Sequence, residues 1–199
     1  MRWPKFISAI LHPVVMPTIG MLLYFMYTPI RLNQQQKYTV LAIVFVATYI
    51  IPVLLLVLLK KVNYIQSYKV HTISERKIPM FFMMTLFLFL GNFFGRIPVV
   101  AELQYLFYAT VLGLVIIYLL FPLKIKASLH LLSMGIAIGY FLLLQQLQTI
   151  YIIPLILVLM FFSGVLASAR LHLKAHTTLE VFLGFFIGVF SPFITFLAL

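Results

Sequence analysis

Apolar residues fill long runs of this chain, and polar residues mark the points between the runs. Most runs are long enough to cross a hydrocarbon core of roughly 30 Å as helices, which satisfy their backbone hydrogen bonds internally. Alternating barrel strands do not fit the pattern. It predicts seven spans, at residues 6–27, 38–59, 80–94, 103–120, 129–144, 150–169 and 178–197. We therefore expect an all-α, polytopic transmembrane helix bundle of about six or seven spans, in a single domain over residues 1–199.

The third predicted span, 80–94, is short for a membrane crossing at about 1.5 Å per residue. Gly95, Arg96 and Pro98 follow it at once, so it could be a broken or re-entrant element. Prolines inside three other spans should bend those helices, which neighbours in a bundle can tolerate. They are Pro13 and Pro17 in the first span, Pro52 in the second and Pro154 in the sixth.

Composition supports an integral membrane protein. Hydrophobic residues make up 64% of the 199 residues and charged residues 9%, far outside the range of ordinary soluble domains. The absence of cysteine excludes disulfides, thiolate nucleophiles and cysteine metal sites. Residues 1–5 resemble the start of a signal peptide, but no convincing cleavage site follows, so we expect the first apolar segment to be retained.

The chain is strongly basic, with a net charge of +11 from fourteen Lys and Arg against three Glu. In so apolar a chain, anionic lipid headgroups or phosphate are better partners for this charge than nucleic acid. The seven-span arrangement places eleven of the fourteen cations on the face that carries the N-terminus: Arg2, Lys5, Lys60, Lys61, Lys69, Arg76, Lys77, Lys124, Lys126, Arg170 and Lys174. The positive-inside rule predicts that this basic face is cytoplasmic.

Histidines follow the same asymmetry, which the positive-inside rule does not explain. His71, His130, His172 and His176 lie at the basic face, and His12 lies about two turns inside it. Three polar clusters at this face are therefore candidates for chemistry.

The first cluster joins Arg170, His176 and Glu180. Glu180 lies one helical turn after His176, close enough to accept a hydrogen bond from the imidazole and fix its tautomer, as nucleophilic or general-base work requires. Arg170 and His176 could both point at one anion. The alternative is a capping box, in which Thr177 and Glu180 cap the last span without a catalytic role.

The second and third clusters could each bind an anion. Ser128 starts the fifth span and could hold a phosphate at the helix N-terminus, while His130 supplies a proton. The alternative is an ordinary serine cap beside a buried histidine. Lys69 and Arg76 are seven residues apart, and on a helix they would share a face and clamp an oxyanion. The alternative there is a solvated basic loop before a helix that starts at Pro79.

In the order in which they occur along the chain, from Lys69 to Glu180, the three clusters resemble the three-part signature of the phosphatidic acid phosphatase type 2 superfamily. That signature is Lys-x6-Arg-Pro, then Pro-Ser-Gly-His, then Ser-Arg-x5-His-x3-Asp. This chain has Lys69-x6-Arg76, then Ser128-x-His130, then Arg170-x5-His176-x3-Glu180. The resemblance covers roughly residues 69–184, and its third element is the most specific.

The resemblance implies a membrane lipid phosphatase that hydrolyses a lipid phosphomonoester or pyrophosphate. His176 would be the nucleophile that forms a phosphohistidine, Glu180 its orienting carboxylate and His130 the general acid for the leaving group. Lys69, Arg76, Ser128 and Arg170 would hold the phosphoryl oxygens. No metal or cofactor is implied, and the partners would be a phosphorylated membrane lipid and the bilayer, which we expect to be a bacterial inner membrane.

The chain departs from the signature at several positions. Leu129 stands where the family has glycine, which lets the backbone approach phosphate closely. Glu180 replaces aspartate, Ala127 replaces proline and Ala169 replaces serine. Lys77 and Ile78 separate Arg76 from Pro79.

Two other functions stay open. One is a degenerate relative that binds phosphorylated lipid without turnover, which Leu129 favours. The other is a small transporter, although the ionisable residues gather at one face and the spans contain few polar groups at depth. Arg96, near Pro98, is a rival for the first motif, but it falls on the opposite face and lacks an upstream lysine.

Overall fold

The structure is a computed structural model that describes residues 3–68 and 72–199. The described residues form helices and no strands, and six helices are long and apolar enough to cross a membrane. The first is continuous over Gln34–Lys61, and comprises α3 (Gln34–Phe45), a π-helical segment (Val46–Ile50) and α4 (Ile51–Lys61). The others are α5 (Ile73–Gly95), α6 (Leu103–Leu119), α7 (Leu129–Gln148), α8 (Ile153–His172) and α9 (Thr178–Ala198). The prediction of an all-α transmembrane bundle is confirmed.

The first predicted span is not one helix. It consists of α1 (Trp3–Ile10), which packs on α8, and α2 (Met16–Tyr27), which packs on α3 and α7. Residues 11–15 form turns between them, because Pro13 has no N–H to continue α1 and Pro17 favours a new helix start. The prolines therefore break the segment rather than bend it, and they leave His12 at the break.

The third predicted span is also longer than expected. Helix α5 begins at Ile73, seven residues before the predicted start, and runs to Gly95 without a break. Thr72 caps it, since its hydroxyl accepts from the Glu75 N–H at 3.2 Å while the Glu75 carboxylate accepts from the Thr72 N–H at 3.2 Å. The broken-element and Pro79-start alternatives are therefore wrong, and Arg76 lies in the first turn of the helix.

The other prolines differ in their effects. One turn before Pro52, the helix widens to π geometry, and the Ile51 N–H bonds to the Val46 carbonyl five residues earlier. Pro154 lies in the first turn of α8, where its missing N–H costs nothing, so no bend is needed there.

Helix α7 is the most buried of the spans, and it packs most closely against α9. Glycines on both helices allow this approach: a Cβ at Gly135 would collide with the Phe185 carbonyl, and one at Gly184 would collide with the Ser128 carbonyl. The contact holds the first residues of α7 against the first turn of α9. It thereby brings the first and second polar clusters together.

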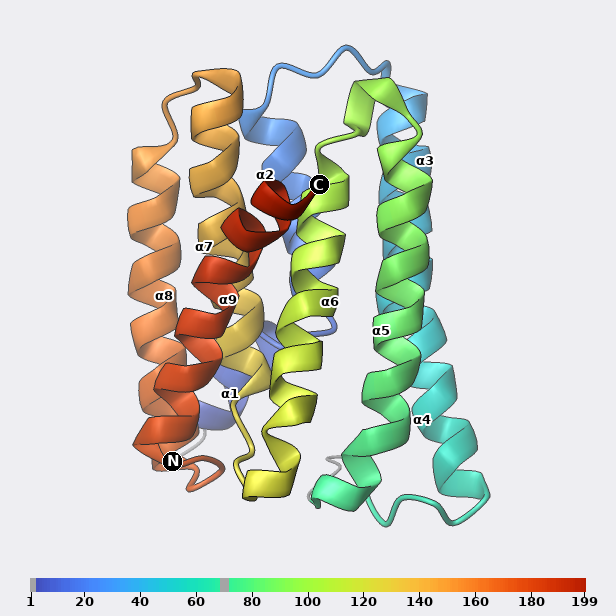
Figure 1. Ribbon diagram of the computed structural model, residues 1–199, viewed down its shortest axis with the longest axis vertical. Helices are drawn as coiled ribbons and strands as arrows, with labels where there is room; N and C mark the ends of the chain where they lie inside the picture. The colour runs from blue at the N-terminus through green and yellow to red at the C-terminus, as the bar shows by residue number, and fades with distance from the viewer. Residues whose placement is uncertain (1–2, 69–71) are drawn as a thin grey trace.

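The connections fall into two groups at opposite ends of the bundle. The links α4–α5, α6–α7 and α8–α9 lie at the end where the chain begins, and the links α2–α3, α5–α6 and α7–α8 lie at the other (Figure 1). The described parts of the three clusters therefore share one end, as the seven-span arrangement predicts.

Candidate functional site

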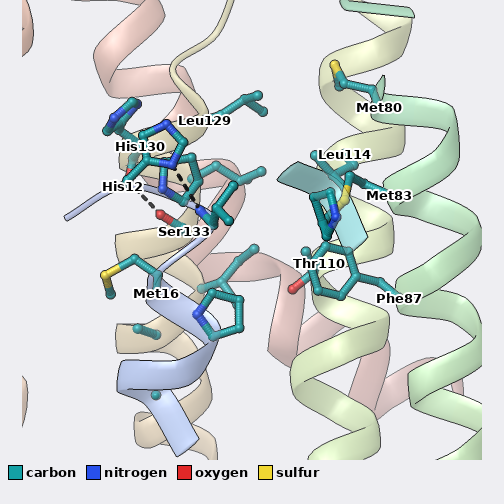
Figure 2. Close-up of a pocket in the computed structure, with 18 of the residues that line it drawn as sticks. His12, Met16, Met80, Met83, Phe87, Thr110, Leu114, Leu129, His130 and Ser133 are labelled. Carbon is teal, nitrogen blue, oxygen red and sulfur yellow. Dashed lines mark hydrogen bonds between the residues drawn. The ribbon is translucent and has the colours of Figure 1, made fainter. Parts of the chain in front are cut away.

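A cavity of about 250 Å³ lies inside the bundle and reaches the basic end. Its histidine and arginine side chains come from three helices, the α1–α2 break and the α8–α9 link: Arg76 on α5, His130 on α7, Arg170 on α8, His12 at the break and His176 before α9. Figure 2 shows His12, Met16, Leu129, His130 and Ser133 on one wall and Met80, Met83, Phe87, Thr110 and Leu114 on the other. Four of the predicted site residues thus line one cavity.

The contacts of His176 fix its tautomer. Nδ1 lies 3.0 Å from the Lys126 carbonyl oxygen and 3.3 Å from Glu180 Oε2. Both partners are acceptors, so Nδ1 carries the proton and Nε2 keeps its lone pair. Burial, together with Arg170 and Arg76, lowers the pKa of His176 to about 4 even though Glu180 opposes them. At neutral pH the imidazole is therefore uncharged, and its contact with Glu180 is a hydrogen bond rather than an ion pair.

Glu180 combines the two roles that the sequence left as alternatives. Its Oε2 accepts from the Thr177 N–H at 3.0 Å and the Thr177 hydroxyl accepts from the Glu180 N–H at 3.3 Å, so the capping box is present. The same carboxylate accepts from the His176 imidazole, and its Oε1 accepts from the Lys126 N–H at 2.9 Å. The cap holds the carboxylate beside the imidazole, and Lys126 contributes through its backbone.

The two arginines supply positive charge next to His176. Both line the cavity, and both lower the pKa of that imidazole. The Nε of Arg170 is buried without a hydrogen-bond partner in the described part of the chain. A buried guanidinium is costly unless it meets an acceptor, so this cavity is suited to an anion.

His130 lies in the same cavity with one nitrogen already engaged. Its Nε2 lies 3.1 Å from the Ser8 carbonyl, which can only accept, so Nε2 carries a proton and Nδ1 is the nitrogen left for other partners. The His12 ring packs edge-on against His130, with ring centroids 5.1 Å apart. Burial, with Arg170 nearby, lowers the pKa of His12.

The predicted site did not include His12. A continuous first helix would leave it as one polar residue in a span, whereas the break between α1 and α2 places it on the cavity wall. The sequence signal was the pair of prolines that follow His12, Pro13 and Pro17.

Ser128, a predicted phosphate-binding residue, is not brought to the cavity. The Ser128 hydroxyl is fully buried, makes no capping bond, has no partner among the described residues and does not line the cavity. Its backbone N–H instead donates to the Glu180 carbonyl at 2.9 Å, and Leu129 lines the cavity in its place. Lys69 lies outside the described residues. The rival Arg96 lies at the other end of α5.

The described residues contain no group of three or more His, Asp and Glu side chains placed to hold a metal ion. The histidine and arginine side chains that line the cavity offer imidazoles and guanidinium groups, and the Glu180 carboxylate lies behind His176. Comparison of the chain with protein-family models, with curated proteins and with solved structures gives no match.

Proposed function

We propose that this protein is a membrane lipid phosphatase that hydrolyses a lipid phosphomonoester or pyrophosphate through a phosphohistidine at His176. One observation carries the proposal: a neutral imidazole, with its Nδ1 proton held by Lys126 and Glu180, shares a cavity with two arginines at the basic end of the bundle. A nucleophile with a free lone pair beside groups that neutralise phosphoryl charge is what phosphoryl transfer requires.

The first half-reaction uses the free nitrogen of His176. Nε2 attacks the phosphorus, and the bond from phosphorus to the lipid oxygen, or to the bridging oxygen of a pyrophosphate, breaks. Arg76 and Arg170 neutralise the phosphoryl oxygens, and the Lys126 carbonyl and Glu180 stabilise the positive charge that develops on the ring. His130 takes a proton at Nδ1 from the bound phosphoryl group and gives it to the leaving oxygen, while Nε2 stays bonded to Ser8.

The second half-reaction restores the histidine. Water attacks the phosphorus of the phosphohistidine, the bond from phosphorus to Nε2 breaks, and inorganic phosphate leaves. His130 takes up the proton of the attacking water at Nδ1 and passes it to the departing phosphate. Each group therefore returns to its starting protonation state.

A catalytically degenerate lipid-binding protein is the second candidate. Leu129 favours it, because this side chain lines the cavity beside the histidines where the superfamily signature has glycine. Such a protein would hold the phosphorylated lipid between the arginines and release no phosphate.

Phosphate release by the purified protein from a panel of lipid phosphates and pyrophosphates separates the two functions. We expect turnover that His176→Ala abolishes. His172→Ala is the matched control, because His172 lies four residues away, is exposed and does not line the cavity. Absence of phosphate release from every lipid by the wild type would leave the degenerate binder, and equal loss in both variants would refute a specific role for His176.

We further propose that the site faces the cytoplasm of a bacterial inner membrane. The predicted spans assign eleven of the fourteen Lys and Arg to the end that carries the cavity mouth. If Lys69, Arg76 and Arg170 are left out because they would bind phosphate, eight cations remain at that end against three at the other. The C-terminus lies at the other end of the bundle (Figure 1). A reporter fused after Leu199 should therefore work only if it folds outside the cytoplasm, and a reporter active only in the cytoplasm would contradict this orientation.

A further inference from the structure

The cavity continues well beyond the histidines and arginines into the apolar interior. Along α7 its lining runs from His130 to Phe141, about 16 Å at about 1.5 Å per residue. That depth is about half of a hydrocarbon core of roughly 30 Å, the thickness of one leaflet. The site is therefore a charged mouth on a passage as deep as a lipid chain.

The wall of this passage is apolar and adaptable. Its lining includes Met16 on α2, Leu55 on α4, Met80 and Met83 on α5, and Ile136 on α7. Two of the hydroxyls in it are already used: Thr110 donates to the Leu106 carbonyl at 2.8 Å, and Ser133 donates to the His130 carbonyl at 2.9 Å. The Tyr140 hydroxyl, near the deep end, has no partner among the described residues. Methionine side chains pack against irregular apolar groups, so such a wall fits a flexible hydrocarbon chain.

Gly20 on α2 marks a point where the passage is wide. The residue is buried, yet a Cβ built on it would meet no atom within 4 Å. Two ring contacts give its depth: His12 lies against His130 at 5.1 Å near the mouth, and Tyr24 lies 6.3 Å from Tyr140 near the deep end. Because Gly20 is one turn before Tyr24, it borders the deep part of the cavity.

We infer that the cavity takes one hydrocarbon chain of the phosphorylated lipid inside the bundle, and that the space at Gly20 sets the longest chain that fits. The inference rests on the proposed function for the phosphate at the mouth. The charge of Arg76 and Arg170 selects an anionic headgroup there, and the apolar wall below selects the chain attached to it. The substrate class is thus a lipid phosphate whose chain length is limited by the depth of this cavity.

The test compares two glycine substitutions. Gly20→Leu fills the deep part of the cavity and improves helix propensity, so it should fold. Gly164→Leu is the matched control, because Gly164 on α8 is exposed and its added Cβ also meets no atom within 4 Å. Ala137→Leu, on the neighbouring helix α7, fills the same cavity from a second element.

The probes are hexyl, decyl and tetradecyl phosphonate, which cannot be hydrolysed, and binding is measured by thermal stabilisation of the protein in lipid nanodiscs. We expect Gly20→Leu and Ala137→Leu to weaken binding of the tetradecyl probe by about tenfold or more, the size of effect expected when methylenes are forced into filled space. Hexyl phosphonate should bind them as it binds the wild type. Gly164→Leu should match the wild type for all three probes.

Equal loss for all three probes, or no loss for the longest, would overturn the inference, as would failure of every probe to bind the wild type. The proposed function fails separately. If no lipid phosphate is hydrolysed but the chain-length effect of Gly20→Leu is present, the chain site stands and the phosphatase does not. If phosphate release is normal and the chain-length effect is missing, the phosphatase stands and the chain site does not.

Discussion

Replacement of Glu180 by glutamine tests how much the Glu180 carboxylate and the Lys126 carbonyl each contribute to the orientation and tautomer of His176. The carboxylate accepts from Lys126 N–H at 2.9 Å, Thr177 N–H at 3.0 Å and His176 Nδ1–H at 3.3 Å. A glutamine side chain has one carbonyl oxygen and one NH2 group, and the NH2 group cannot accept a hydrogen bond. In either orientation, this NH2 group therefore faces at least one of the three N–H donors. Glu180→Gln therefore loses at least one buried bond to a charged acceptor, which costs about 1.5–3 kcal/mol.

The same magnitude sets the expected loss of activity. If the amide oxygen faces His176, the bond remains but the negative charge that stabilises the developing imidazolium does not. A loss of about 1.5–3 kcal/mol in the transition state lowers kcat by roughly ten- to 150-fold. Activity should not vanish, because the Lys126 carbonyl still holds the Nδ1 proton at 3.0 Å.

The assay is kcat for phosphate release together with the thermal unfolding midpoint, for Glu180→Gln, Glu180→Asp and His176→Ala. Glu180→Asp keeps the charge but is one methylene shorter, so it should lose less than Glu180→Gln in kcat. A Glu180→Gln variant with wild-type kcat would refute the role of the carboxylate. One as inactive as His176→Ala would refute the claim that the Lys126 carbonyl maintains the tautomer.

Three further predictions follow from the site and the packing around it. Because burial lowers the pKa of His176 to about 4, its neutral form persists below the ordinary value of about 6.5, so kcat should be maintained to about pH 5 and fall as pH drops through 4; a fall centred near pH 6.5 would contradict the burial of His176. His130→Ala should reduce kcat most for substrates with poor leaving groups, whereas an equal reduction across a leaving-group series would contradict its role as general acid. Gly184→Ala should lower stability by about 1–3 kcal/mol, because its Cβ collides with the Ser128 carbonyl, while Gly164→Ala on the exposed side of α8 should not; equal thermal unfolding midpoints would contradict the close α7–α9 contact.

The sequence predicted the architecture well because long apolar runs have few structural solutions in a membrane. It also predicted which connections share an end, since each crossing reverses the chain. Errors came at helix ends. Pro13 and Pro17 broke the first span instead of bending it, and the Thr72–Glu75 capping box started α5 seven residues before the apolar run.

The arrangement of the candidate site was predictable where side chains carry the interaction. Three of the predicted residues, His130, Arg170 and His176, line one cavity. Glu180 lies one helical turn after His176, as predicted, and accepts a hydrogen bond from its imidazole. The Lys126 carbonyl was not predictable, because any residue offers that acceptor and only the α7–α9 packing places it there. The same packing leaves the Ser128 hydroxyl outside the cavity lining, and no sequence pattern predicts this position.

The central claim is that His176 Nε2 becomes phosphorylated, and trapping the phosphoenzyme tests it most directly. The purified protein would be mixed with a lipid phosphate labelled in the phosphoryl group, quenched in base within milliseconds to seconds, and mapped by peptide mass spectrometry. We predict a base-stable, acid-labile phosphohistidine at His176, present in His172→Ala and missing in His176→Ala. Phosphate release with no label on His176, or label on another residue, would contradict the mechanism.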